Sequence, residues 1–284
     1  MDLTDINEIR LLLDRHGFRF SKSLGQNFLT ASWVPENIAE SAGLDRDTAV
    51  LEIGPGIGCL TRELSARAGK VVSIELDRSL QSILNETLSD CGNVETVYGD
   101  AMKIDLRKLA EEKFNGLRPV VCANLPYNVT SPLLTKILEA DIFDSVTVMI
   151  QKEVAERICA CPNTADYGAF TVFCQWYADT SMLFNVPPSC FIPQPKVTSS
   201  VIDMKKRQTL PARVNNEELM FRIVRAAFNQ RRKTLVNAVA SGLGIDKVIV
   251  ERSLVNCGLD IRIRGEVLSI AQFAQISDEI ETNF

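Results

Sequence analysis

Residues 49–60 read AVLEIGPGIGCL, and this stretch decides the fold. Its first residues are apolar and typical of a buried strand, and the residues after Gly58 have the spacing of a helix. Gly54, Gly56 and Gly58 lie between these two segments. Because glycine has no Cβ, the backbone there can turn tightly and approach a ligand closely. A strand, a glycine-rich turn and a helix in this order predict the ligand-binding edge of a parallel α/β sheet.

Strand-like and helix-like segments alternate through the first two thirds of the chain. Strands are expected at 49–54, 71–76, 94–100, 119–125 and 145–151, each followed by a helical segment. This alternation is typical of βαβ units, which form a parallel sheet with helices on both faces. Two further strand-like runs, 180–186 and 198–206, predict an antiparallel hairpin at one sheet edge. The expected fold class is therefore α/β, with a Rossmann-like, mostly parallel sheet.

The pattern changes after the last of these strands, because the remaining chain is only helical. Helices are expected at 216–242, 246–257 and 269–281. Glu217 and Glu218 fall in the first turn of the first of them, where acidic side chains suit the helix dipole. We therefore expect a Rossmann-like domain over 1–207, which includes a helical lead-in, and a small helical domain over 208–284.

The charges of the chain are distributed unevenly. The whole chain has a net charge of −5, but residues 205–233 contain nine Lys or Arg and only two Asp or Glu. A local excess of positive charge in an acidic protein is typical of a surface that binds nucleic acid. It is equally compatible with a linker and a solvated helix face, so the charge pattern alone leaves both interpretations open.

Residue counts exclude several classes of site. The chain has eight cysteines and a single histidine, His16. No pair of cysteines has the C-x-x-C spacing of a zinc site, and one histidine is too few for a histidine cluster, so no metal is expected. No apolar run reaches the length of a membrane span, and the N-terminus lacks the apolar region of a signal peptide. We expect a monomeric cytoplasmic protein with reduced thiols and no membrane partner.

The acidic residues around the glycine turn indicate which ligand the sheet binds. Glu75 ends the second strand, 21 residues after Gly54, where a carboxylate can accept both hydroxyls of a ribose. The G-x-G-x-G spacing differs from the dinucleotide pattern, and Pro55 removes an amide that could hold a pyrophosphate. Glu52, just before the glycines, repels phosphate and attracts an ammonium group. The combination favours S-adenosylmethionine, although a tight turn beside a surface acid explains either feature alone.

The third and fourth strands end in further polar residues. Asp100, followed by Ala101, can accept a hydrogen bond from an adenine amino group, although an Asp in a turn is also common. The fourth strand ends in Asn124, Leu125, Pro126 and Tyr127. The Asn124 carboxamide oxygen and a backbone carbonyl of Leu125 or Pro126 can accept from an exocyclic amine and aim its lone pair at a methyl donor.

Aromatic residues near this turn complete the expected acceptor site. Tyr127 can stack on a base, and Phe191, which precedes the proline-rich run at 193–197, can supply a second stacking face. SLGQNFL places Gly25, Gln26, Asn27 and Phe28 before the sheet, where they can cover the cofactor. A core phenylalanine and an ordinary connector are the simpler interpretations of the last two stretches.

The chain resembles the KsgA-type rRNA adenine dimethyltransferases in a series of motifs. These are SLGQNFL, LEIGPGIGCLT, IELD, GDAM, NLPYNVTSPLL, QKEVAERI, FIPQPKVTSSV and AFNQRRKTL, which occur in the order typical of that family and span nearly the whole chain. The resemblance implies transfer of methyl groups from S-adenosylmethionine to N6 of two adjacent adenosines. These lie in the 3′-terminal hairpin loop of small-subunit rRNA, and S-adenosylhomocysteine is the other product. It also implies a role in late small-subunit assembly.

Carried onto this chain, the resemblance assigns roles to individual residues. Cofactor contacts fall on Asn27, Leu29, Glu52, Gly54, Gly56, Glu75, Asp100, Ala101 and Asn124. The acceptor site consists of Asn124, Leu125, Pro126, Tyr127 and Phe191. Phosphate contacts fall on Arg222, Arg225, Arg231, Arg232 and Lys233. The loop CACPNTADYG after AERI has neither the glycine nor the lysine at the places where family members often carry them, which puts one RNA contact in doubt.

Two rival functions remain open on the sequence. Enzymes that methylate large-subunit rRNA and confer macrolide resistance share the cofactor loop and the N-[IL]-P-[YF] turn, but the AFNQRRKTL segment favours the small-subunit class. A non-catalytic RNA-binding assembly factor on the same fold is the other rival. The presence of Glu75, Asp100 and Asn124 argues against it, because binding alone does not need a cofactor site.

Overall fold

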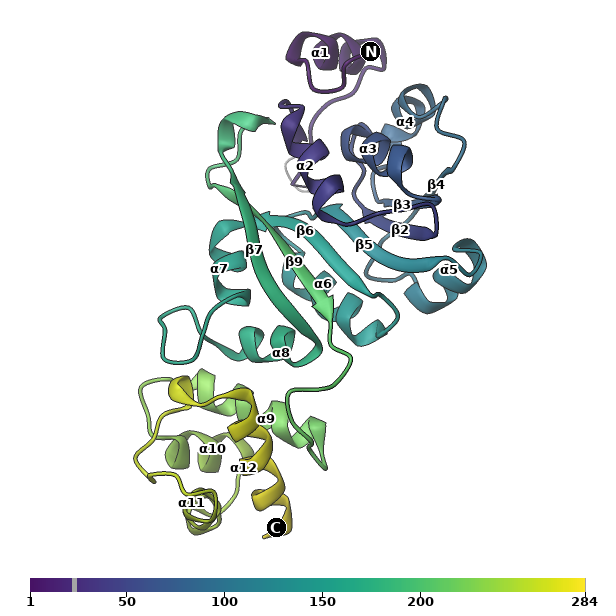
Figure 1. Cartoon of the computed structure of the whole chain (residues 1–284). Coiled ribbons are helices and arrows are strands. Elements are labelled where there is room, and N and C mark those ends of the chain that lie inside the picture. Colours follow the sequence, from purple (N-terminus) through teal and green to yellow (C-terminus); the bar gives the residue numbers. More distant parts are fainter. Residues whose placement is uncertain (22–24, 284) are drawn as a thin grey trace. The chain divides into compact units, whose positions relative to one another are not determined.

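The computed structural model describes residues 1–21 and 25–283 of the chain (Figure 1). The chain forms two compact units. The first contains Met1–Ala155 and Thr180–Lys206, and the second contains Glu156–Asp179 and Arg207–Phe284. The division after Lys206 lies next to the boundary that we expected between 207 and 208, but the segment 156–179, which we assigned to the first domain, groups with the helices of the second.

The first unit is built on a seven-stranded sheet with the order β4-β3-β2-β5-β6-β9-β7. The strands are β2 (Thr48–Ile53), β3 (Lys70–Glu75), β4 (Val94–Tyr98), β5 (Arg118–Asn124), β6 (Ser145–Gln151), β7 (Ala178–Val186) and β9 (Ser199–Lys206). The first five in sequence pair in parallel, and β9 is antiparallel to β6. This confirms the predicted α/β fold and mostly parallel sheet, with β7 and β9 as neighbours at one edge.

Helices precede, connect and follow the parallel strands of this sheet (Figure 1). They are α1 (Ile6–Arg15), α2 (Trp33–Ser41), α3 (Cys59–Arg67), α4 (Gln81–Thr87), α5 (Leu106–Lys113), α6 (Thr130–Ala140) and α7 (Lys152–Ile158). The helices α1 and α5 begin at side-chain caps: Asp5 accepts from the amides of Asn7 and Glu8, and Asp105 accepts from those of Arg107 and Lys108. A separate two-stranded ribbon pairs β1 (Phe28–Leu29) with β8 (Phe191–Ile192), which joins the segment before the sheet to the proline-rich loop.

The strand register brings the functional ends of the strands together. Glu75 is the last residue of β3, and Asn124 is the last residue of β5. Both strands are hydrogen-bonded in parallel to β2, which ends at Ile53, directly before the glycine turn. Because carboxyl ends of parallel strands meet at one edge of a sheet, Glu75 and Asn124 come to line one opening although they are 49 positions apart in the sequence.

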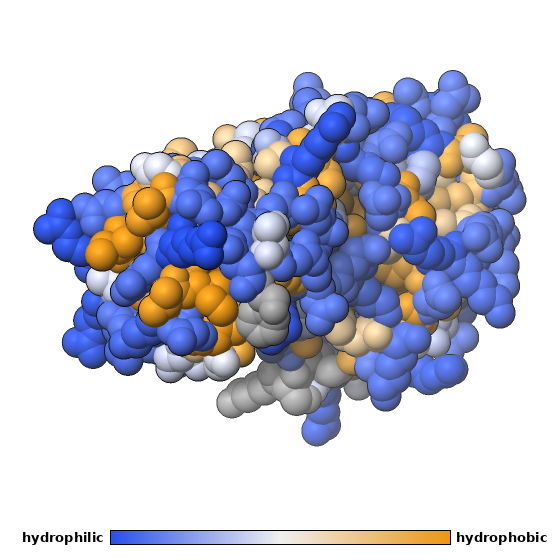
Figure 2. Space-filling view, turned by 90° about the horizontal axis from the view of Figure 1, so that it is seen from below, coloured by the Kyte–Doolittle hydropathy of each residue, from blue (hydrophilic) through white to orange (hydrophobic). Residues whose placement is uncertain are grey.

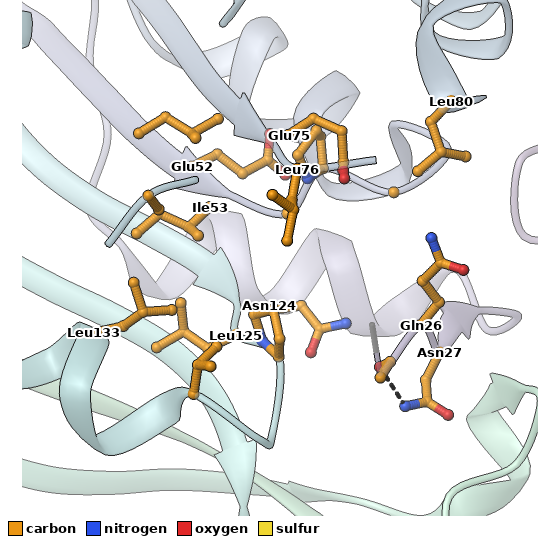
Figure 3. Close-up of a pocket in the computed structure, with 18 of the residues that line it drawn as sticks. Gln26, Asn27, Glu52, Ile53, Glu75, Leu76, Leu80, Asn124, Leu125 and Leu133 are labelled. Atoms are coloured by element: carbon orange, nitrogen blue, oxygen red, sulfur yellow. Dashed lines mark hydrogen bonds between the residues drawn. The ribbon is translucent and has the colours of Figure 1, made fainter. Parts of the chain in front are cut away.

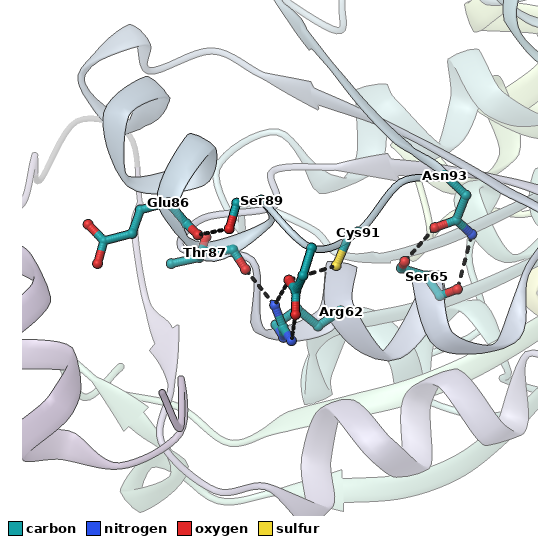
Figure 4. Close-up of polar contacts among 8 residues, drawn as sticks. Arg62, Ser65, Glu86, Thr87, Ser89, Cys91 and Asn93 are labelled. Carbon is teal, nitrogen blue, oxygen red and sulfur yellow. Dashed lines mark hydrogen bonds and ion pairs between the residues drawn. The ribbon is translucent and has the colours of Figure 1, made fainter.

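Polar contacts fix the connection between α4 and β4 (Figure 4). Arg62 of α3 forms two hydrogen bonds to the Asp90 carboxylate, at 2.6 and 2.8 Å, and one to the Thr87 carbonyl at 2.7 Å. The Asn93 amide donates to the carbonyl of Ser65, also on α3, at 3.0 Å. These bonds hold the loop before β4, and the register they support places Tyr98 opposite Glu75.

The second unit is a small helical domain with its own core. Its helices are α8 (Ala169–Tyr177), α9 (Glu217–Asn229), α10 (Leu235–Leu243), α11 (Lys247–Asn256) and α12 (Ile270–Thr282). The predicted single helix over 216–242 is wrong, because the chain breaks between α9 and α10. Thr234 caps α10 by accepting from the amide of Asn237, which starts a new helix there.

Three interactions explain why 156–179 joins this unit. Trp176 and Tyr167 are fully buried in the same apolar core as α9 and α12, and the Tyr167 hydroxyl donates to the Leu268 carbonyl at 2.8 Å. Trp176 Nε1 also donates to the Glu217 carboxylate at 3.1 Å, and the Tyr177 hydroxyl donates to its other oxygen. The first turn of α9 therefore accepts both polar groups at the end of α8.

Among the described residues, no helix is both long and apolar enough to cross a membrane. The face that Figure 2 presents is mostly hydrophilic, with apolar residues in separate patches.

Glu217→Ala is expected to destabilise the protein, because it leaves the Trp176 and Tyr177 donors without their acceptor. The free energy of unfolding, measured by denaturant titration, should fall by about 1–3 kcal/mol. The control is Glu218→Ala, since Glu218 lies in the same first turn but is exposed. It should cost roughly 0.3–1 kcal/mol through the helix dipole alone. Equal losses for the two variants would contradict a specific role for Glu217.

Candidate active site

A pocket lies at the carboxyl ends of β2, β3 and β5, entirely within the first unit. Its lining comes from five parts of the chain: 25–29, 52–60, 74–80, 99–102 and 124–133. Figure 3 shows Glu52 and Glu75 on one side, Asn124 and Leu125 on the opposite side, and Gln26 and Asn27 at one end. The structure thus brings together all nine predicted cofactor contacts.

Gly54 and Gly56 of the glycine turn line this pocket, and their backbone conformations favour glycine. Gly54 and Gly56 have φ values of +75° and +60°, in the left-handed region that side chains with a Cβ rarely adopt. A Cβ on Gly56 would lie 3.1 Å from the ring of Phe28, which lines the same pocket. Glycine at this position therefore serves both the backbone conformation and the close approach of the segment before the sheet.

Glu52 has a buried carboxyl group, and only one of its two oxygens is hydrogen-bonded to the described residues. Its Oε2 accepts from the hydroxyls of Thr61 and Ser73, each at 2.7 Å. Its Oε1 is buried and has no hydrogen-bond partner among the residues that the structure describes. Burial raises the pKa of Glu52 to about 7, and the charge of Glu75 adds a smaller increase. The hydrogen bonds from the two hydroxyls lower this pKa, but their effect is smaller than that of burial. A buried anionic oxygen without a partner fits a cationic ligand group.

Glu75 is held by backbone amides at the end of β3. Its Oε1 accepts from the amide of Asp77 at 2.7 Å. Burial raises the pKa of Glu75 to about 7, and hydrogen bonds from the backbone of Asp77 and Gly56 act in the opposite direction. The carboxyl group is thus oriented by the glycine turn and by its own loop. Its position and its two oxygens fit a pair of neighbouring hydroxyls.

The segment 25–29 is tied to the rest of the pocket. Gln26 Nε2 donates to Asp77 Oδ2 at 2.7 Å, and Asn27 Nδ2 donates to the Gly25 carbonyl at 2.9 Å. Leu29 pairs with Phe191 in the two-stranded ribbon. Asn27 and Leu29 both line the pocket, as expected, and the Gln26–Asp77 hydrogen bond joins them to the loop that orients Glu75.

Asp100 and Ala101 form the wall after β4. Both line the pocket. One oxygen of Asp100 accepts from the amide of Met102 at 2.9 Å, and the other lies 3.9 Å from the ammonium of Lys103. The Asp100 carboxylate is therefore fixed by its own turn, as the simpler interpretation expected, and still faces the cavity.

The turn after β5 is held by backbone hydrogen bonds. The amide of Leu125 donates to the Met149 carbonyl at 3.1 Å. The Pro126 carbonyl accepts from the amide of Val129 at 3.2 Å and from the Thr130 hydroxyl at 3.0 Å. Because the Pro126 carbonyl already has two donors, the Leu125 carbonyl is the better backbone acceptor for a ligand. The Asn124 side chain has no hydrogen bond to the described residues.

The two aromatic residues predicted for the site lie in different surroundings. Tyr127 lines the pocket, is half-buried, and shares a hydrogen bond of 2.5 Å with the Ser199 hydroxyl. Phe191 is only 2% exposed, packs in the core of the unit and is not among the residues that line the pocket. The structure brings Tyr127 to Asn124 but buries Phe191, because β8 pairs with β1. A stacking role for Phe191 stays a prediction.

Four of the five predicted phosphate contacts are exposed on the second unit. Arg222 and Arg225 lie on α9, and Arg232 and Lys233 lie in the turn between α9 and α10. Arg231 differs, because its guanidinium contacts Glu266 at 3.2 Å and the Thr164 carbonyl at 2.9 Å. Arg231 therefore has a structural role within the unit.

Sequence reasoning missed the hydroxyl groups that support the site. Ser73 reaches Glu52 because β2 and β3 pair in parallel with these two residues opposite each other. Ser199 reaches Tyr127 across 72 positions of sequence. Neither serine has a distinctive local pattern, so only the strand order could have identified them.

Comparison with known proteins gives a consistent result. The family model described as ribosomal RNA adenine dimethylase matches residues 17–282. The ribosomal RNA small subunit methyltransferase A of Alkaliphilus metalliredigens is 46% identical over 96% of each chain. The protein of the same name from Clostridioides difficile is 44% identical over 99% of this chain and 97% of its own.

Solved structures resemble the fold over most of its length. A dimethyladenosine transferase from Plasmodium falciparum aligns with a TM-score of 0.73 and 26% identity, covering 87% of this chain and 95% of its own. The 23S rRNA methyltransferase ErmE aligns with a TM-score of 0.69 and 26% identity, covering 89% and 99%. Because the family model covers nearly the whole sequence and full-length relatives share 44–46% identity with it, the chain belongs to the ribosomal RNA adenine dimethylase family.

Proposed function

We propose that this protein transfers methyl groups from S-adenosylmethionine to N6 of two adjacent adenosines in the 3′-terminal hairpin loop of small-subunit rRNA, forming N6,N6-dimethyladenosine. One observation carries the proposal. A single pocket combines three carboxyl groups suited to the cofactor, Glu52, Glu75 and Asp100, with the Asn124–Tyr127 turn suited to an adenine. The names of the relatives, ribosomal RNA small subunit methyltransferase A, support the choice of RNA.

The pocket fits S-adenosylmethionine in the chemistry of its lining. The partnerless Oε1 of Glu52 suits the ammonium of the amino-acid tail, and Glu75 suits the ribose hydroxyls. Asp100 accepts from the adenine amino group, while Asn27 and Leu29 cover the ligand. When bound, S-adenosylmethionine supplies a methyl group on a sulfonium, which makes that carbon electrophilic and leaves S-adenosylhomocysteine. No side chain has to act as a nucleophile in such a transfer.

The Asn124–Tyr127 turn prepares the acceptor nitrogen. N6 of adenine is a weak nucleophile because its lone pair is delocalised into the ring. The Asn124 carboxamide oxygen and the Leu125 carbonyl accept from its two hydrogens, which favours a pyramidal nitrogen with a directed lone pair. Tyr127 stacks on the base, a contact worth about 1–3 kcal/mol. Since the nitrogen loses a proton readily once it is alkylated, positioning and electrostatics supply most of the catalysis.

The second unit supplies contacts to the RNA backbone. Arg222, Arg225, Arg232 and Lys233 are exposed and suited to phosphates. A base that undergoes chemistry must leave its stack, and a hairpin loop lowers the cost of this step. We place the protein in the bacterial cytoplasm as a monomer that acts on the assembling small subunit in late biogenesis.

Methylation of large-subunit rRNA is the second candidate, because ErmE shares the fold with a TM-score of 0.69. The identity of 44–46% to small-subunit enzymes, against 26% to ErmE, favours the small-subunit substrate. The deciding experiment transfers labelled methyl groups from S-adenosylmethionine to small subunits from a strain that lacks the modification, followed by nucleoside analysis. Dimethyladenosine at two adjacent loop positions supports the proposal. Transfer to large-subunit RNA alone, or RNA binding without transfer, overturns it.

The stability of the free protein is expected to fall as pH rises from about 5 to about 7. Glu52 and Glu75 have folded-state pKa values raised to about 7 from 4.5. In this range the folded state keeps protons that the unfolded state has released, so the stabilisation present at low pH is lost as the carboxyl groups ionise. Denaturant unfolding as a function of pH should show a shallower dependence for Glu52→Gln. Glu40→Gln, at an exposed position, is the control and should leave the slope unchanged.

Asn124→Ala is expected to lower kcat for methyl transfer by about 100-fold or more, because it removes one acceptor for the amine hydrogens. The fold, measured by thermal melting, and RNA affinity should remain. Asn85→Ala, an exposed position on α4, is the control for loss of a carboxamide. Unchanged turnover in Asn124→Ala would show that this side chain does not hold the amine.

Arg232→Glu with Lys233→Glu is expected to weaken binding of the rRNA hairpin and to flatten its salt dependence. The slope of log affinity against log salt should become shallower by about one to two, as expected when two phosphate contacts are lost. A matched control reverses two exposed bases on α11 of the same unit, Lys247→Glu with Arg252→Glu. If both pairs weaken binding equally, the effect comes from net charge and not from a defined contact.

A further inference from the structure

The hydroxyl of Tyr127 has one partner in the described structure, the hydroxyl of Ser199. Ser199 is fully buried and is the first residue of β9. Stacking on a base needs only an aromatic ring, so the hydroxyl of Tyr127 adds nothing to that contact by itself. Its hydrogen bond to a rigid strand instead fixes where the ring lies.

Backbone hydrogen bonds hold Ser199 in a fixed place relative to the acceptor turn. Ser199 lies opposite Gln151 at the end of β6, and the amide of Lys152 donates to the Thr198 carbonyl at 3.0 Å. Two residues earlier on β6, the Met149 carbonyl accepts from the amide of Leu125 at 3.1 Å. The start of β9, the end of β6 and the Asn124–Tyr127 turn are therefore joined by main-chain contacts, and the Ser199 hydroxyl projects from this frame.

We propose that Ser199 is a positioning residue for the acceptor site, which sets the plane of the Tyr127 ring before a base enters. This inference rests on the proposed function, since it assigns the ring to the target adenine. A ring that is already fixed loses no further side-chain freedom when the base stacks on it. Without Ser199, the ring must be ordered during binding or in the reactive complex, which costs roughly 2- to 10-fold in rate or affinity.

The next residue offers a matched control. Ser200 is also fully buried, and its hydroxyl donates a hydrogen bond to the Asn185 side-chain oxygen at 2.7 Å. Tyr127 is hydrogen-bonded to Ser199 and not to Ser200. Because successive side chains of a strand point to opposite faces, Ser199 and Ser200 share burial and backbone but not their partners. Ser200→Ala therefore reproduces the loss of a buried hydroxyl without touching the acceptor site.

The test compares Ser199→Ala, Tyr127→Phe, the double variant and Ser200→Ala. Methyl transfer from S-adenosylmethionine to small subunits should show kcat reduced by roughly 2- to 10-fold in both single variants, with KM for the cofactor unchanged. The double variant should be no slower than either single variant, because both remove the same hydrogen bond. Tyr127→Phe leaves no cavity in the core, so it tests the bond even if Ser199→Ala folds poorly.

A second measurement reports how the target base stacks on the Tyr127 ring, independently of methyl transfer. A hairpin RNA with 2-aminopurine at one target position reports stacking through fluorescence quenching on binding. Quenching should decrease in Ser199→Ala and persist in Ser200→Ala at equal RNA occupancy. Wild-type rate and quenching in Ser199→Ala, or equal losses in the two serine variants, would overturn the inference. Absence of transfer by the wild-type protein would instead refute the proposed function.

Discussion

The carboxyl group of Glu52 joins three elements at the centre of the sheet, since its Oε2 accepts from Thr61 of α3 and from Ser73 of β3. These bonds fix the two sides of the glycine turn, because Glu52 precedes it and Thr61 follows it. The turn in turn orients Glu75, through the backbone of Gly56. The cost of burying this carboxyl group is visible in its raised pKa. Glu52 lines the pocket, and its second oxygen has no hydrogen-bond partner among the described residues. The site thus depends on one buried acid that the fold satisfies only in part.

The two sides of the pocket use different physical means. On the cofactor side, carboxyl groups are held by amides and hydroxyls, so charge and orientation are set together. On the acceptor side there are neutral oxygens and an aromatic ring, held by main-chain hydrogen bonds to β6 and by the Ser199 hydroxyl. This division suits the proposed methyl transfer, in which a cationic donor needs negative charge nearby and an uncharged amine needs acceptors that direct its lone pair.

Much of the fold and of the cofactor side could be predicted from the sequence, because both depend on local patterns. Alternating strands and helices predicted the sheet, and the glycine turn with Glu75 predicted the pocket. The prediction failed where tertiary contacts decide. The break between α9 and α10 depends on the Thr234 cap, and the position of 156–179 depends on Trp176 meeting Glu217. Ribbon pairing with Leu29 buries Phe191, which the sequence could not show, and the stacking role of Phe191 stays a prediction.

The segment 156–179 has a consequence for how the protein is made. The chain passes between its two compact units three times, after Ala155, after Asp179 and after Lys206. On the ribosome, Tyr167 and Trp176 emerge long before α9 and α12, whose side chains bury them. A nascent chain that has finished its sheet therefore still exposes two large aromatic residues until synthesis is nearly complete. The same aromatic surface makes residues 1–207 a poor unit for separate expression, because the segment 156–179 would then lack the helices that bury its aromatic side chains.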